Sequence, residues 1–187
     1  KKPFEKSEPL ANQMKIIPAA QGTVSVFFPA EKETSGLRFH LHGPFVPELS
    51  RASIKNSPAN LPLYSQLAAL TAKLLHRIRD ASLLRGEFLA VLPNKDDSLP
   101  ERYRIIRQVV LDEMRQHALV PKHGGGYASA NGLLQSSAAL KDLLSAEDLA
   151  LVTEREDEPA WVIGINQRNS NQDRLLASLG IENWDIG

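Results

Sequence analysis

The spacing of apolar residues changes along this chain, and the change limits the possible folds more than any other feature of the sequence. From Leu37 to His42, apolar and polar residues alternate with a period of two, which is typical of a half-buried strand. From Leu63 to Ile78, apolar residues recur every three or four positions, which is typical of one buried helix face. Pro44 and Pro47 separate the two patterns. The sequence therefore predicts an α+β fold, with a small antiparallel β-sheet followed by a mainly helical region.

The predicted sheet is a hairpin near the amino-terminal end. Its first strand is Gly22 to Phe28, which is rich in β-branched and aromatic residues, and Pro29 ends it. Ala30 to Gly36 is charged and is expected to form the turn. Leu37 to His42 is expected to return as the antiparallel partner strand.

Two long helices are expected to form most of the remaining core. The first has Asn60 as its expected cap and extends to about Asp80. The second begins at a capping box of Ser98 and Glu101. The expected buried stripe of the first helix is Leu63, Leu67, Leu70, Leu74 and Ile78, and that of the second is Tyr103, Ile106, Val110 and Met114.

Shorter elements complete the predicted region. Phe88 to Leu92 is apolar and is either a strand or a buried connector. Short helices are expected at about 137–144 and 146–152, and Trp161 to Ile165 is a candidate strand. Ser170 with Asp173 predicts the start of a last helix, which Gly180 closes.

The length of 187 residues fits one large domain. We expect residues 1–21 to be a linker or the tail of a preceding domain, 22–180 the domain itself, and 181–187 a tail. If the domain is divided, the expected boundary lies near Asn94. The chain begins without methionine and enters its first strand early, so we interpret it as a piece of a longer protein.

The charge balance bears on possible partners. Lys+Arg and Asp+Glu number 22 each, so no net field attracts the chain to nucleic acid or to an anionic membrane. The arginines of the second long helix offer a local basic patch, but a solvated helix face is the simpler interpretation; these are Arg102, Arg104, Arg107 and Arg115. Without cysteine, disulfides and thiolate chemistry are excluded. No apolar run is long enough to span a membrane, and we expect a cytoplasmic protein.

The candidate binding residues lie in the polar loop after the strand that ends at His42. Arg51 and Lys55 stand there among serines and an asparagine. An arginine offers a fixed fork of donors and a lysine a point charge, and both suit a terminal phosphate on a neighbouring domain. The alternative is that both are solvated loop cations that contribute little.

Other candidate sites are less complete. His40 and His42 share one strand face, but no third metal ligand is near in sequence, so we expect an exposed polar face and no metal site. The glycines after His123 follow a helix rather than a strand, so a turn is expected instead of a phosphate cradle. Asp96 and Asp97 are expected to be solvated. No catalytic residue is assigned.

Several segments together resemble sacsin-like ATPases of the GHKL superfamily, which includes the ninety-kilodalton heat-shock chaperone, DNA gyrase B and MutL. The matching segments are FFP at Phe27 to Pro29 and LRFHLHGPFVPELSRASI at Leu37 to Ile54. The helix from Leu61 to Asp80 and FLAVLPN at Phe88 to Asn94 follow in the same order. The resemblance covers about residues 22–135 and is to the region after the nucleotide-binding domain.

That resemblance implies a non-catalytic transducer or middle region. In this superfamily, a basic residue of that region reaches the terminal phosphate of ATP in the neighbouring domain. Arg51 matches the Ser-Arg loop, and Lys55 is the second candidate. The superfamily's own ATP-binding elements are not recognisable here, so ATP with Mg is expected in the parent protein and not in this segment alone.

Three functions are therefore open. The first is the transducer, whose partners are the neighbouring nucleotide-binding domain and a possible protein client. The second is a protein–protein interaction module with no nucleotide role. The third is a small enzyme that uses His40, His42 or His123 and needs a concave pocket, which nothing in the sequence assembles.

Overall fold

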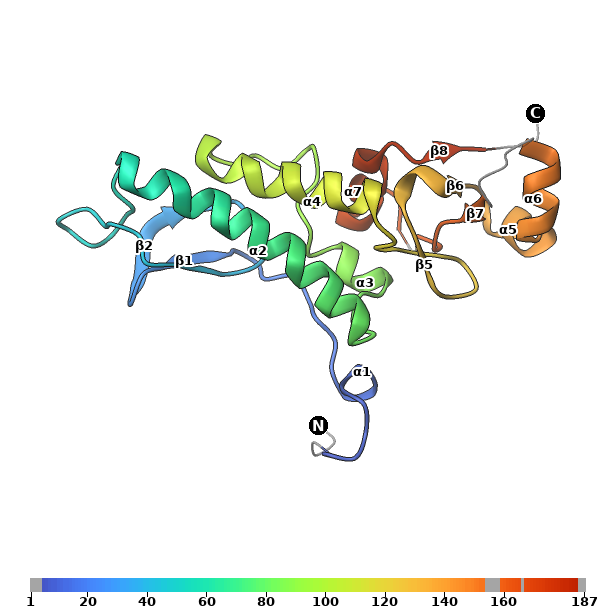
Figure 1. Cartoon of the computed structure of the whole chain (residues 1–187), viewed down its shortest axis with the longest axis horizontal. Helices are drawn as coiled ribbons and strands as arrows, with labels where there is room; N and C mark the ends of the chain where they lie inside the picture. Colours follow the sequence, from blue (N-terminus) through green and yellow to red (C-terminus); the bar gives the residue numbers. More distant parts are fainter. Residues whose placement is uncertain (1–4, 154–158, 166, 185–187) are drawn as a thin grey trace.

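The computed structural model describes residues 5–153, 159–165 and 167–184 and has the predicted α+β character. The outer ends of the two expected tails, residues 1–4 and 185–187, lie outside that description. Figure 1 shows an elongated arrangement: a small sheet at one end, two long helices side by side, and a second sheet with short helices at the other end. Among the described helices, none has both the length and the apolar character needed to cross a bilayer.

The first sheet has the strand order β2-β1-β3. Its central strand, β1 (Thr23–Ser25), pairs antiparallel with β2 (Pro29–Thr34) and parallel with β3 (Leu41–His42). The predicted hairpin is therefore wrong in its pairing. Its antiparallel partner is the stretch expected to be a turn, and the expected strand 37–42 contributes only its last two residues, in parallel orientation.

The physical reason is that charged residues of β2 have partners elsewhere in the fold. Ala30 and Glu33 are the two buried positions of this strand, and the Glu33 carboxylate is bonded inside the protein. The chain then bends at Gly36, whose φ of +71° is in the left-handed region that favours glycine. A Cβ at Gly36 would also lie 2.7 Å from the carbonyl oxygen of Ser98.

Helix α2 (Leu61–Asp80) has the predicted extent, but its predicted buried stripe is correct only in part, since Leu63, Leu67 and Ile78 pack partly buried against the core. A short 3-10 turn, η1 (Pro58–Asn60), precedes it. Leu70 and Leu74 are 51% and 46% exposed. The fully buried residues of the helix are Tyr64, Ala68, Ala72 and Leu75. The two alanines leave room for a neighbouring helix to approach closely, so the side of the helix with smaller residues is the one that packs.

That neighbour is α4 (Arg104–Gln116), which lies beside α2 in Figure 1. Its predicted buried residues are confirmed, since Tyr103, Ile106, Val110 and Met114 are all fully buried. The predicted capping box does not form. A 3-10 turn, η2 (Glu101–Tyr103), leads into the helix from Pro100, and no side chain caps either element.

The connector between the two long helices is buried. Helix α3 (Gly86–Leu89) begins it, and Phe88 to Leu92 line the core rather than forming a strand. Arg38 fastens this connector to the first sheet, because its guanidinium binds both Asp97 oxygens, at 2.6 and 2.9 Å, and donates to backbone carbonyls of the connector. The prediction that Asp97 is solvated was therefore wrong.

The carboxyl-terminal end contains a second, parallel sheet with the order β7-β6-β8. The two predicted short helices are confirmed, and the last helix has its Ser170 cap and ends at Gly180, with φ of +77°. The candidate strand at 161–165 is shorter than expected. The elements are β4 (Val120–Pro121), β5 (Tyr127–Ala128), η3 (Ala130–Gly132), β6 (Leu133–Gln135), α5 (Ala138–Leu143), α6 (Ala146–Thr153), β7 (Ala160–Trp161), α7 (Asn171–Leu179) and β8 (Glu182–Asn183).

Two large apolar clusters form the core, and α4 contributes to both. One joins the first sheet to the start of α4 through residues such as Val24 and Ile106. The other joins the rest of α4 to the connector and α7, for example Met114, Leu89 and Leu175. Residues from both sides of position 94 therefore share one core. The amino-terminal segment carries a single short helix, α1 (Leu10–Gln13), among its described residues.

Candidate functional site

The loop that carries Arg51 projects from the end of the molecule, between β3 and α2 (Figure 1). We call residues 46–55 the Arg51 loop. An antiparallel bridge between Pro47 and Ile54 closes it at its base. The amide of Glu48 donates to the carbonyl of Ser53 at 2.9 Å, and the amide of Arg51 donates to the carbonyl of Glu48 at 2.8 Å. The loop is thus a tight turn with internal backbone hydrogen bonds.

Arg51 is exposed at the tip of this turn and has an uncommon backbone conformation. Its φ of +60° lies in the left-handed region, which costs a non-glycine residue about 1 kcal/mol or more. Its guanidinium lies 5.5 Å from the centre of the Phe28 ring, within cation–π distance. Among the described residues, no carboxylate pairs with it. The fold therefore presents an arginine with free donors at a fixed position.

Asn60 clamps the base of the Arg51 loop. Its side-chain oxygen accepts from the amide of Val46 at 2.8 Å, and its side-chain nitrogen donates to the carbonyls of Val46 and Lys55 at 3.0 and 2.8 Å. The predicted capping bond of Asn60 to α2 is absent, because the side chain is 1% exposed and turned to the loop. One buried amide therefore holds both ends of the loop together.

A buried carboxylate holds the loop from its other side. Glu33, whose side chain is 1% exposed, accepts from the Ile54 amide at 3.1 Å and from the Tyr103 hydroxyl at 2.7 Å. It also pairs with Arg102 at 2.7 Å, and Arg102 donates in turn to the Ile54 carbonyl at 3.3 Å. We call Glu33, Arg102 and Tyr103 the Glu33 cluster. It ties the end of the Arg51 loop to the start of α4.

The electrostatics of the Glu33 cluster favour a protonated tyrosine. Burial, followed by the hydrogen bond to the Glu33 carboxylate, raises the pKa of Tyr103 far above its ordinary value. The Arg102 guanidinium lies 5.6 Å from the centre of the Tyr103 ring. Tyr103 therefore acts as a fixed hydrogen-bond donor to Glu33. The Glu33 carboxylate also pairs with the Arg102 guanidinium.

Lys55 lies at the base of the loop and not at its tip. Its amide donates to the carbonyl of Val46 at 3.0 Å, and its side chain is exposed. Among the described residues, no hydrogen bond or ion pair holds its ammonium group. The structure thus places the two predicted residues on one loop, with Arg51 at the apex and Lys55 where the loop joins the fold.

The two histidines near β3 are both exposed, as expected, but only His42 lies in the strand. His40 precedes β3, and its Nδ1 lies 2.7 Å from the Thr23 hydroxyl oxygen and 3.1 Å from the Thr23 amide nitrogen. His42 is exposed in β3. Within the described ranges, no group of three or more histidine, aspartate or glutamate side chains is placed to hold a metal ion.

The arginines of the second helical segment are not a free basic patch. Arg102 joins the Glu33 cluster, and Arg107 donates to the carbonyls of residues 94, 95 and 97. Arg104 and Arg115 also donate to backbone carbonyls, in Leu99 and in residues 178 and 179. The prediction of a solvated face is therefore wrong for Arg102, Arg107 and Arg115, which are partly buried against loops around α4, whereas Arg104 is exposed.

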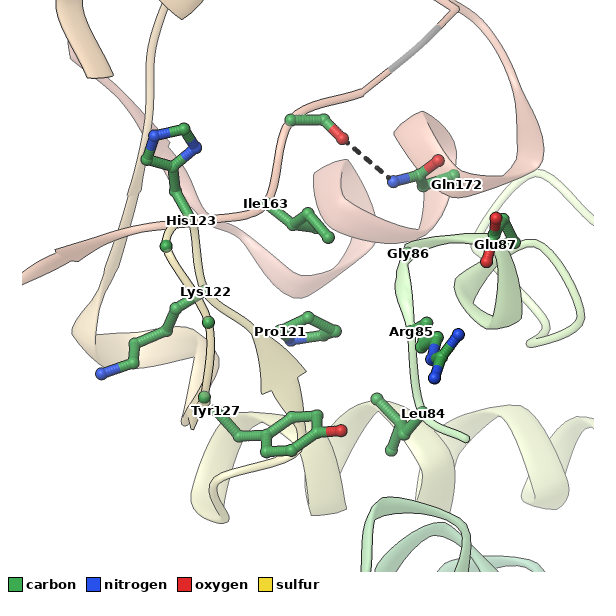
Figure 2. A pocket seen from close by; sticks show the side chains of 14 residues that line it. Leu84, Arg85, Gly86, Glu87, Pro121, Lys122, His123, Tyr127, Ile163 and Gln172 are labelled. Atoms are coloured by element: carbon green, nitrogen blue, oxygen red, sulfur yellow. Dashed lines mark hydrogen bonds between the residues drawn. The ribbon is translucent and has the colours of Figure 1, made fainter. Parts of the chain in front are cut away.

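An open groove of about 610 Å³ lies beside the turn between β4 and β5. Figure 2 shows Leu84, Pro121, Tyr127 and Ile163 facing the space, while Lys122 points away from it. Its floor is therefore mainly apolar. This concavity was not anticipated from the sequence, since its walls come from four separate segments of the chain.

His123 lies at the edge of this groove, before a turn of three glycines that all have positive φ. Its Nε2 is 3.3 Å from an oxygen of Asp142, which is exposed. In the part of the chain that the structure describes, no hydroxyl nucleophile is hydrogen-bonded to His123. The groove therefore offers a hollow but not a nucleophile paired with a base.

The residues that position Arg51 were missed by the sequence analysis. Glu33 stands in a charged stretch that resembles a turn, and Asn60 stands where a helix cap is expected. A weak signal existed only for Asn60, which stands between Ala59 and Leu61, whereas Glu33 is flanked by Lys32 and Thr34. Their partners are distant in sequence, so local patterns did not identify them.

Comparison of this chain with protein-family models, curated proteins and solved structures found no match. The geometry of the Arg51 loop and its anchors is thus the observation from which a function can be inferred.

Proposed function

We propose that this chain is the non-catalytic transducer segment of a larger GHKL-type ATPase. In this proposal, Arg51 senses the terminal phosphate of ATP, bound with Mg in a neighbouring domain. The segment then relays the closure of that domain to the rest of the protein. The observation that carries the proposal is an exposed arginine that has no carboxylate partner among the described residues and is held in a left-handed conformation at the tip of a loop with buried anchors.

The bracing supports a role in binding rather than a chance surface position. Strained backbone conformations persist where the surrounding structure enforces them, and they cluster at functional sites. Here Asn60 and the Glu33 cluster supply that enforcement with buried hydrogen bonds. A pre-positioned guanidinium loses little conformational freedom on binding a phosphate, and its fork matches two phosphate oxygens.

The connection from the loop to α4 supports the relay. Ile54, at the end of the loop, is bonded to both Glu33 and Arg102. Arg102 stands in the turn that opens α4, and α4 packs along α2 and against α7. A displacement of the loop would therefore act on buried charged bonds at the start of the central helix.

The test is ATP turnover by the full-length parent protein, with nucleotide binding measured alongside. We expect Arg51→Ala to lower turnover at least tenfold while nucleotide binding is retained, because a positioned cation stabilises charge that develops on the phosphate. Arg77→Ala is the matched control, since Arg77 is an exposed arginine of α2 without a partner among the described residues. Arg51→Gly removes the same cation but relieves the backbone strain, so it separates loss of charge from damage to the loop.

Unchanged turnover in Arg51→Ala and Arg51→Gly would remove the sensing role. A parent protein without an ATPase domain would overturn the family assignment itself.

The alternative function is an interaction module with no nucleotide role. Its support is apolar exposure near the loop, since Phe27 and Leu49 are both large and solvent-exposed. Under this alternative, Phe27→Ala and Leu49→Ala weaken partner binding, while Arg51→Ala leaves ATP turnover unchanged.

A further inference from the structure

A second hollow has a volume of about 590 Å³. The elements that line it lie at the opposite end of the molecule from the Arg51 loop (Figure 1). Its walls come from β6, the start of α5, the segment before α7 and the end of β8. We call it the Lys141 pocket, after the one lysine that lines it. It takes no part in the proposed phosphate sensing, so an inference about it is independent of that function.

Lys141 is a buried cation without a described anionic partner. It is 5% exposed, and its Nζ donates to the carbonyl of Val162 at 2.9 Å and to the side-chain oxygen of Gln135 at 3.2 Å. Both acceptors are neutral. An ammonium has three donors, so one has no partner among the described residues. Burial lowers the pKa of this lysine, as expected for a charge removed from water without compensation.

Ser136 provides a second unpaired group in the same wall. Its hydroxyl oxygen is buried and has no hydrogen-bond partner among the described residues. Buried polar groups in folded proteins are nearly always bonded, so the unbonded Ser136 hydroxyl needs an explanation. An oxyanion bound in this pocket would supply an acceptor for the hydroxyl and a counter-charge for the Lys141 ammonium.

Other residues of the pocket fit such a ligand. Arg168 lines the pocket, is exposed and has no ion pair within the described ranges. Asp173, the one carboxylate among the described residues of the lining, already accepts from the amide of Asn169 at 2.7 Å. The Trp184 ring lines the pocket and offers an apolar surface.

We propose that the Lys141 pocket binds a small ligand through an oxyanion group, which is a carboxylate or a phosphate. The Lys141 ammonium and the Ser136 hydroxyl donate to the oxyanion. Arg168 supplies a second positive charge, and the Trp184 ring contacts the body of the ligand.

The test uses tryptophan fluorescence of the full chain. The chain has two tryptophans, Trp161 and Trp184, whose ring centres are 6.0 Å apart, so the signal comes from this region alone. Sodium phosphate and sodium acetate are titrated separately, and sodium chloride at equal ionic strength corrects for screening. We expect a saturable change with at least one of the two anions, and the responding anion identifies the oxyanion class.

Two variants and a control make the result specific. Lys141→Met should raise Kd at least tenfold, because it removes a charged donor, and Ser136→Ala should raise it about threefold to tenfold. Lys95→Met changes the net charge equally at an exposed site and should leave Kd unchanged. Ser136→Ala removes only an unbonded hydroxyl, so the thermal midpoint should not fall, and its Kd remains interpretable even if Lys141→Met does not fold. The proposal is overturned if both anions act like chloride, or if Ser136→Ala binds as tightly as the wild type.

Discussion

Replacing Glu33 by glutamine tests whether the Arg51 loop depends on a buried charge. The substitution keeps the size of the side chain but removes the carboxylate that three groups share, namely the Ile54 amide, the Tyr103 hydroxyl and the Arg102 guanidinium. The glutamine NH₂ is itself a donor, so it would face one of these three donors without forming a hydrogen bond. We therefore expect a less stable protein with a looser Arg51 loop.

The expected size follows from the burial of the two charges. Removing one partner of a fully buried ion pair costs about 3–5 kcal/mol. Here Glu33 is 1% exposed but the Arg102 side chain is 33% exposed, so water partly solvates the cation that remains. We expect Glu33→Gln to lower the free energy of unfolding by about 2–4 kcal/mol, measured by urea denaturation. Faster hydrogen exchange of the Ile54 amide should accompany the loss.

Two comparisons show whether the reasoning holds. Glu31→Gln is the control, since Glu31 is exposed in the same strand and should change stability by less than about 0.5 kcal/mol. A double-mutant cycle with Arg102→Met should give a coupling of about 1–3 kcal/mol. An effect of Glu33→Gln as small as that of Glu31→Gln, with unchanged exchange at Ile54, would refute the role of the buried carboxylate.

Three further predictions concern packing, backbone space and pH. Leu75→Ala should lower the free energy of unfolding by about 2–5 kcal/mol and Leu74→Ala by less than about 1 kcal/mol, because only Leu75 is buried. Equal losses of the two variants in urea denaturation would contradict the described buried face of α2. Gly22→Ala should lower the free energy of unfolding by at least about 3 kcal/mol, because its Cβ would lie 2.1 Å from a backbone carbonyl oxygen. Gly164→Ala, with no atom within 4 Å of its Cβ, should be nearly neutral in the same assay. Tyr103 keeps its proton in the folded protein at pH values where the tyrosine of the unfolded chain, with a pKa of 10.0, loses it. The raised pKa therefore contributes its full stabilisation of the fold below pH 10, and this contribution is lost as the pH rises further. Tyr103→Phe should lack this alkaline loss, and parallel stability curves for the two proteins above pH 10 would disprove it.

Much of the helical structure could be predicted because its signals are local. The extent of α2, the buried residues of α4 and the Ser170 cap of α7 all follow from patterns within one or two helical turns. Capping and periodicity act over a few residues, so a single sequence contains the information needed to predict them.

The partners of the strands could not be read in the same way. Local alternation indicated a strand at 37–42, but pairing depends on which segments meet in space. The charged stretch of β2 forms a strand because Glu33 forms an ion pair with Arg102 and accepts a hydrogen bond from Tyr103, both of which are far along the chain. Similarly, the leucine stripe of α2 was a valid helix signal, yet the alanine side of the helix packs against α4.

By itself, the sequence determined that the chain is an α+β protein with two long helices, and that Arg51 and Lys55 lie in one polar loop. Only the tertiary structure decided that Arg51 stands at a strained tip and Lys55 at the base. The reason is distance along the chain: the amide of Asn60 acts on Val46, 14 residues away, and Glu33 binds Tyr103, 70 residues away. Such contacts form only when the whole chain folds, and they hold the loop that carries the candidate site.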